Sequence, residues 1–116
     1  MAFADGVLLE VRGEKRAACL DLAGTAARVF RDRGALEAVA RRGDDAPEGR
    51  VTSVPMAVKL QPGESAVFSW VLWPGCAARD RGTKGSSEDP RMAAVKEAPF
   101  DGQRTMFGGF EAILKA

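Results

Sequence analysis

The sequence contains no histidine and only two cysteines, and both shortages limit the chemistry available to it. Without histidine, Ser-His-Asp and Cys-His mechanisms are excluded, so acid–base chemistry would depend on Asp, Glu, Lys or a substrate group. Cys19 and Cys76 lie far apart and form no CxxC pair, whereas a zinc site needs several Cys or His ligands. We therefore predict neither a metal nor a cofactor.

The sequence also lacks an excess of charge and any long apolar run. It has 17 Lys and Arg residues against 16 Asp and Glu residues, so its charge favours neither a nucleic acid nor a membrane as a partner. No apolar run approaches the roughly 18 residues of a spanning helix. The first five residues lack the basic region and apolar core of a signal peptide. These features predict a cytoplasmic protein, and a length of 116 residues predicts a single domain over residues 1–116.

The hydrophobic pattern predicts strands and helices in a recognisable order. Strands are expected at 6–11, 35–40, 56–60, 65–73 and 104–114, and helices at 14–33 and from Pro74 onward. Gly82, Gly85 and Ser86-Ser87 should interrupt the second helix, and Asp89 and Pro90 should restart it as N-cap and first residue. The order is βαββαβ with an extra strand. It predicts an α+β, ferredoxin-like fold, in which an antiparallel sheet has both helices on one face.

The predicted sheet carries large apolar side chains on both faces, although two helices cover only one. Trp70 and Trp73, for example, point to opposite faces of the strand at 65–73, which places one in the core and the other at an interface. Soluble monomers rarely leave such a patch open, and closed two-fold dimers are the commonest cover. We therefore predict a homodimer packed through its sheet. The alternative is that the long loop at 41–56 folds over the second face.

The pair Gly108-Gly109 lies inside the last predicted strand, where glycine weakens pairing and packs nothing. It predicts a β-bulge at the meeting point of two sheets, with close approach of a ligand or another backbone as the alternative.

Two charged pairs are candidate ligand-binding residues. Arg79 and Asp80 follow the strand that carries Trp70, so they would hold an anionic molecule beside an aromatic wall, or else form a surface ion pair. Asp101 and Arg104 flank the turn into the last strand. They would act as a general base and an anion anchor, or else as a local turn with a tethering arginine.

A set of short motifs spans nearly the whole chain. They are Asp5-Gly6, Gly34-Ala35-Leu36, residues 45–52, 56–59 and 67–70, Arg79-Asp80, residues 89–92 and residues 99–111. In this order and spacing the chain resembles the YbaA-like family of uncharacterised bacterial proteins, within the dimeric α+β barrel superfamily. The resemblance implies a ferredoxin-like subunit and a dimeric α/β barrel, with no established activity. The wider superfamily includes cofactor-free monooxygenases, haem-degrading enzymes and stress-response proteins, but a fold does not fix a function.

The chain departs from this family at Ala40-Arg41-Arg42, where members often have Glu-Cys followed by an aromatic residue. A role that depends on that acidic residue is therefore not expected here.

Two functional hypotheses follow. The first is a homodimer that binds a small organic or anionic ligand between sheet and helices, with or without cofactor-free catalysis. The second is a non-catalytic structural or stress-related interaction protein whose apolar sheet serves dimerisation only. A cavity beside Arg79, Asp101 or Arg104 would favour the first hypothesis.

Overall fold

The computed structural model describes residues 2–44, 46–47, 49–93 and 104–116. Its elements in chain order are β1 (Phe3–Arg12), α1 (Arg16–Asp32), β2 (Glu37–Arg42), α2 (Val54–Ala57), β3 (Glu64–Trp73), α3 (Cys76–Ser87) and β4 (Met106–Glu111), with single 3-10 turns at Gly13–Lys15 and Pro90–Met92. The four strands form an antiparallel sheet in the order β2-β3-β1-β4. This is the predicted ferredoxin-like arrangement.

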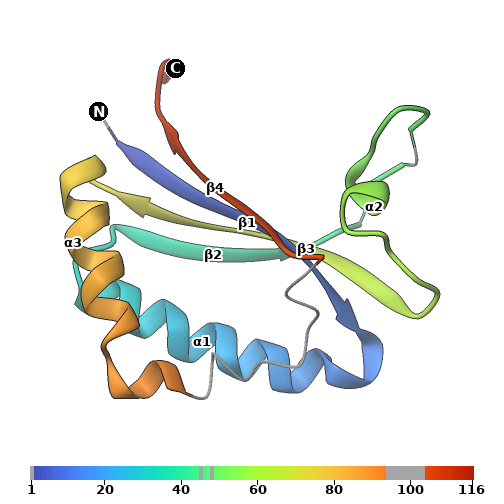
Figure 1. Cartoon of the computed structure of the whole chain (residues 1–116), viewed down its shortest axis with the longest axis horizontal. Helices are drawn as coiled ribbons and strands as arrows, with labels where there is room; N and C mark the ends of the chain where they lie inside the picture. Colours follow the sequence, from blue (N-terminus) through green and yellow to red (C-terminus); the bar gives the residue numbers. More distant parts are fainter. Residues whose placement is uncertain (1, 45, 48, 94–103) are drawn as a thin grey trace.

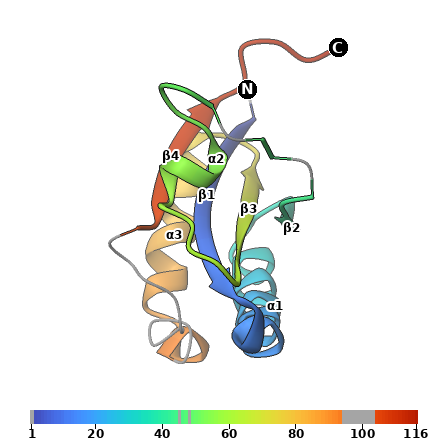
Figure 2. The ribbon, with the colours of Figure 1, turned by 90° about the vertical axis from the view of Figure 1, so that its right-hand side faces the viewer.

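The sheet has two faces that differ in their cover (Figures 1 and 2). The inner face is the one against which α1 and α3 pack, and the outer face is the opposite one, where α2 lies near one end of the sheet (Figure 1). β1 is central because it pairs with β3 on one side and with β4 on the other. Strand alternation places Val7 and Leu9 on the inner face and Leu8 and Glu10 on the outer face. No helix in the described part of the chain is long and apolar enough to cross a membrane.

Trp73 forms the centre of the inner core. It is fully buried, as is Val29 of α1, and the ring of Phe30 meets its indole edge-to-face at a centroid distance of 6.3 Å. Trp70 lies on the outer face, which confirms that the two tryptophans point in opposite directions. α1 ends at Asp32, and Gly34 follows its C-cap with a φ of 110°, a conformation that favours glycine.

The prediction that glycines interrupt the second helix is wrong, because α3 runs without a break over Cys76–Ser87. A Cβ at Gly82 would collide with the ring of Trp73, and one at Gly85 would lie 3.2 Å from Cδ of Arg33. The glycines therefore allow α3 to lie close to the core, and this tertiary packing outweighs their low helix propensity. The predicted cap is confirmed, since the Asp89 side chain accepts a hydrogen bond from the Arg91 N–H.

The strand predicted at 56–60 is also wrong, because this region holds the short helix α2. The Ser53 side chain accepts a hydrogen bond from the Met56 N–H at 3.2 Å, and Pro55 lies in the first turn. These start signals outweigh the short apolar run. Val58, which follows α2, is fully buried.

The last strand is shorter than predicted, and the predicted bulge is absent. β4 pairs continuously with β1, with Gly108 opposite Gly6 and Gly109 opposite Asp5. A Cβ at Gly109 would lie only 2.6 Å from the ring of Phe3 and 2.9 Å from an Arg79 nitrogen. The glycine therefore makes room for side chains on the inner face rather than for an extra residue.

Candidate functional site

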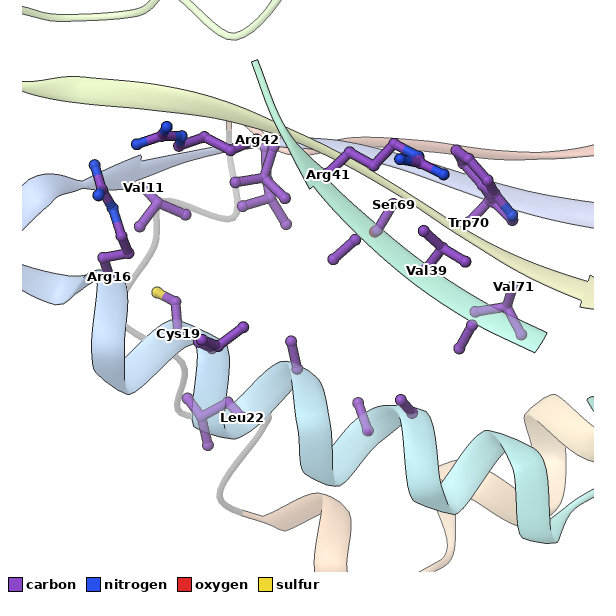
Figure 3. Close-up of a pocket in the computed structure, with 18 of the residues that line it drawn as sticks. Val11, Arg16, Cys19, Leu22, Val39, Arg41, Arg42, Ser69, Trp70 and Val71 are labelled. Atoms are coloured by element: carbon purple, nitrogen blue, oxygen red, sulfur yellow. The ribbon is translucent and has the colours of Figure 1, made fainter. Parts of the chain in front are cut away.

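A cavity of about 500 Å³ lies between α1 and the inner face of the sheet. Figure 3 shows its walls, which come from one side of α1 and from β1, β2 and β3. Most of the lining is aliphatic, and the hydroxyl-bearing Ser65 and Ser69 of β3 also belong to it. Phe30 lines the cavity where α1 packs against Trp73, so the core closes that end.

Small side chains create this space. α1 presents Ala23 and Ala26 to the cavity, and β2 presents Ala38 and Ala40 from the other side. Alanines on both walls leave a gap that neither backbone fills. The packing is therefore uneven along α1: Val29 is fully buried near its end, whereas Leu20 near its start is 69% exposed although it lines the cavity.

The open end of the cavity carries two positive charges. Arg16 is the first residue of α1 and Arg42 is the last residue of β2, and Figure 3 shows both side chains at the same end. No hydrogen bond or ion pair holds either guanidinium within the described part of the chain. We call this pair the basic mouth.

Cys19 lies just inside the basic mouth (Figure 3). Burial raises the pKa of its thiol, and the negative charge of Glu10 raises it further, while Lys15 acts in the opposite direction. The cavity wall is therefore a poor environment for an anion at this depth.

Trp70 contributes to the cavity wall, but its indole lies on the outer face. Figure 3 shows Trp70 and Arg41 on the side of the sheet away from α1. The Arg41 guanidinium carbon lies 5.1 Å from the ring centroid, and the indole N–H donates to Glu37 at 3.0 Å. The ring of Phe68 also packs edge-to-face against it.

Arg79 and Asp80 belong to a different cluster, at the start of β1. Arg79 Nε lies 3.6 Å from an oxygen of Asp5, and its Nη1 lies 3.3 Å from an oxygen of Asp80. Its guanidinium carbon also lies 4.6 Å from the ring centroid of Phe3. The other Asp5 oxygen accepts a hydrogen bond from the Trp73 indole at 3.1 Å. The cluster thus ties α3 to β1 and to the core.

Arg104 lies at the opposite end of β1, against the outer face. Its two terminal nitrogens donate to the two oxygens of Glu64 at 2.9 and 2.8 Å, and one of them also donates to the Lys59 carbonyl. Glu10 lies 3.6 Å away and is 2% exposed. The fork of hydrogen bonds from Arg104 lowers the pKa of Glu64 to about 2. This group therefore resembles a buried structural ion network.

The candidate residues predicted from the sequence thus lie in three separate places, and Asp101 lies outside the described residues. The cavity is lined by neither Arg79 nor Arg104, contrary to the expected position. A ligand-binding role for Trp70, Arg79, Asp80, Asp101 and Arg104 stays a prediction. The sequence analysis did not single out Arg16 and Arg42. The signal that could have pointed to them was the small side chains on the same two segments, Ala23 and Ala26 after Arg16 and Ala38 and Ala40 before Arg42.

Fold and sequence together define the class of protein, an α+β ferredoxin-like domain. The chain resembles SnoaB, a cofactor-independent oxygenase from Streptomyces nogalater, at 15% identity with a TM-score of 0.66, covering 98% of this chain and 95% of that one. It also resembles a dimeric ferredoxin-like protein from an uncultured marine organism, at 10% identity with a TM-score of 0.64, covering 99% and 98%. At such low identity these likenesses show the fold.

The family follows from sequence. The chain belongs to the family described as "Protein of unknown function (DUF1428)", whose model matches residues 2–102. It is 40% identical to the uncharacterized protein YbaA of Escherichia coli (strain K12) over 115 residues, and this match covers 98% of each chain. The same figures hold for YbaA of Shigella flexneri. This confirms the resemblance drawn from the motifs.

Proposed function

We propose that the protein binds a small, mainly apolar organic molecule in the cavity between α1 and the sheet. The observation that carries this proposal is the cavity itself, whose volume of about 500 Å³ falls among those of ligand sites, roughly 300–1,000 Å³. Its aliphatic walls suit an apolar body. Ser65 and Ser69 supply hydroxyl groups that would orient it.

The test is to fill the cavity and ask whether ligand binding is lost. Ala26→Phe places a ring in the cavity, whereas Ala18→Phe adds the same ring at an exposed α1 position outside the lining. Purified wild type and both variants are screened against a metabolite library by thermal shift. A compound that stabilises wild type and the Ala18 variant but not the Ala26 variant supports the site. A compound that stabilises all three equally binds elsewhere and contradicts it.

We further propose that two copies pack through their outer faces. Phe68, Met106 and Phe110 are 48%, 49% and 64% exposed on this face. The short helix α2 lies near one end of the sheet on this side (Figure 1), and these three side chains stay exposed beside it. Burying one large apolar side chain contributes about 2–3 kcal/mol, and a solved protein of similar fold is described as dimeric.

Charge placed on the outer face tests the dimer. Phe110→Glu should convert a dimer into a monomer in sedimentation or light-scattering measurements at micromolar concentration. Phe107→Glu is the matched control, because Phe107 is 86% exposed but lies on the inner side of the same strand. A monomeric wild type, or a dimer that only the Phe107 variant disrupts, would contradict the proposed interface.

A further inference from the structure

The cavity is polarised from end to end, and this asymmetry points to the chemistry of its ligand. Arg16 and Arg42 form the mouth, and no Asp or Glu belongs to the lining. The remainder is apolar apart from two serines, Cys19 and Arg41, whose guanidinium lies over Trp70 on the side of the sheet away from α1. The inference that follows rests on the proposed function, because it assigns a ligand class to the same cavity.

The two mouth arginines lack the close carboxylate partners that three other arginines of this chain have. Arg33, Arg91 and Arg104 lie within 3.1 Å of carboxylate oxygens. Arg16 and Arg42, in contrast, have no such partner in the part of the chain that the structure describes. A guanidinium is a planar donor that matches a carboxylate. Two guanidinium groups beside an apolar cavity favour a ligand that carries its own anionic group.

The interior sets the opposite requirement. Leu22, Ala26 and Phe30 line it, and none of these side chains offers a partner to a buried charge. A ligand with charge at both ends, or with its charge in the middle, would bury that charge among aliphatic groups. The cavity accordingly suits a molecule with one anionic head and one apolar tail.

We propose that the natural ligand is a single-headed amphipathic monocarboxylate of the fatty-acid kind. Its carboxylate lies between Arg16 and Arg42, and its tail runs between α1 and the inner face toward Phe30. The two arginines are binding residues that select the anionic head, and the alanines of α1 and β2 leave room for the tail.

Titration calorimetry with decanoate, octanoate and decan-1-ol tests the proposal. Decanoate should bind wild type more tightly than the uncharged alcohol of equal length. Octanoate should bind up to about fifteenfold more weakly than decanoate, because each buried methylene contributes about fourfold. Arg16→Gln and Arg42→Gln should each weaken decanoate binding about fivefold and leave decanol binding unchanged.

Three controls separate the explanations. Arg81→Gln removes the same charge from an exposed position of α3 and should leave decanoate binding unchanged. Arg42→Lys keeps the charge but not the planar fork, so it should bind decanoate more tightly than Arg42→Gln and more weakly than wild type. Thermal melting of each variant without ligand verifies that it folds.

Different failures have different meanings. If decanol binds as tightly as decanoate and the Gln variants bind both normally, the carboxylate inference is overturned while the cavity site stands. The same holds if the Arg81 variant loses as much affinity as the mouth variants, because the effect is then one of general charge. If Ala26→Phe leaves decanoate binding intact, decanoate does not occupy the cavity and the inference fails. If that variant also retains every ligand found by screening, the proposed function fails with it.

Discussion

Gly82 allows a sharp test of the fold, because two opposing effects of one methyl group differ in size. In an ordinary exposed helix, replacing glycine with alanine stabilises the protein by roughly 1 kcal/mol. At Gly82 the added Cβ would collide with the buried ring of Trp73 and lie 2.9 Å from the carbonyl oxygen of Arg33. Neither neighbour is the free end of a flexible side chain, so α3 must move away from the core.

Overpacking of a well-packed core costs about 1–3 kcal/mol, and the double collision places Gly82→Ala near the upper end of this range. After subtracting the gain in helix propensity, we expect a net loss of about 2 kcal/mol. For a domain of this size that corresponds to a melting temperature lower by roughly 8 °C. Urea unfolding followed by circular dichroism measures the free energy directly, with melting as a second readout.

Gly24→Ala is the matched control. It lies within α1, and its Cβ would meet only the end of the Arg28 side chain, at 3.7 Å. Here propensity acts alone, so the variant should be more stable than wild type by about 0.5–1 kcal/mol. If Gly82→Ala is at least as stable as wild type, α3 does not pack against Trp73 as described, and the reasoning is refuted.

Three further predictions concern the ion networks and the cysteine. Arg104→Met should destabilise the protein by about 2–3 kcal/mol, because it leaves Glu10 and Glu64 buried without their cation, and adding Glu64→Gln should recover part of the loss in urea unfolding. Arg104 lowers the pKa of Glu64 from 4.5 to about 2. The stabilisation that this ion pair gives the folded state is therefore complete above pH 4.5 and is lost as the pH falls toward 2. The stability gap between wild type and Arg104→Met should therefore narrow over that range, and a constant gap would contradict the pairing. Hydrogen bonds from the Arg91 side chain and backbone, together with Arg33, hold the pKa of Asp89 well below its usual range, so Asp89→Asn should lower the melting temperature at pH 7 and much less in strong acid. An equal effect at both pH values would show that Asp89 acts only by its shape. In a Cys76→Ser variant, Cys19 should react with a thiol reagent more slowly than free cysteine at pH 8, because burial raises its pKa. Decanoate should slow the reaction further, and a rate equal to that of free cysteine would contradict the burial.

The order of elements was predictable because its signals are local. The apolar and aromatic run over Ser65–Trp73 identifies a strand, which pairs with β1 in the structure, and Gly34 follows the end of α1. The strand wrongly predicted at 56–60 was a misreading of local helix start signals, whereas the errors at the glycines arose where a distant contact decides. Whether Gly82 breaks a helix or lets that helix pack against the core depends on Trp73, which lies on β3. Likewise, Gly109 gives room to Phe3, which lies on another strand.

The cavity was less predictable than the fold, because it forms where small side chains of separate elements leave space unfilled. Arg16 and Arg42 each resemble an ordinary solvated charge in the sequence, and 25 positions separate them. Ala26 and Ala40 look like routine helix and strand residues. Only the packing of α1 over β2 shows that these residues share one space. Arg79 and Arg104 were candidates instead because Asp80 and Asp101 lie close to them in the sequence. In the structure Arg79 pairs with Asp5 as well as Asp80, and Arg104 pairs with Glu64, so distant carboxylates decide their roles.

The position of β2 has a consequence for how this protein could change over time. β2 is an edge strand that pairs only with β3, yet its inward-facing Ala38, Ala40 and Arg42 form one wall of the cavity. Ala40 and Arg42 are also part of the segment in which the sequence departs from its family resemblance. If the cavity binds a ligand as proposed, changing these three side chains would change which ligands bind while leaving the Trp73 core untouched. Directed libraries at these three positions should therefore yield altered binding spectra among variants that still fold.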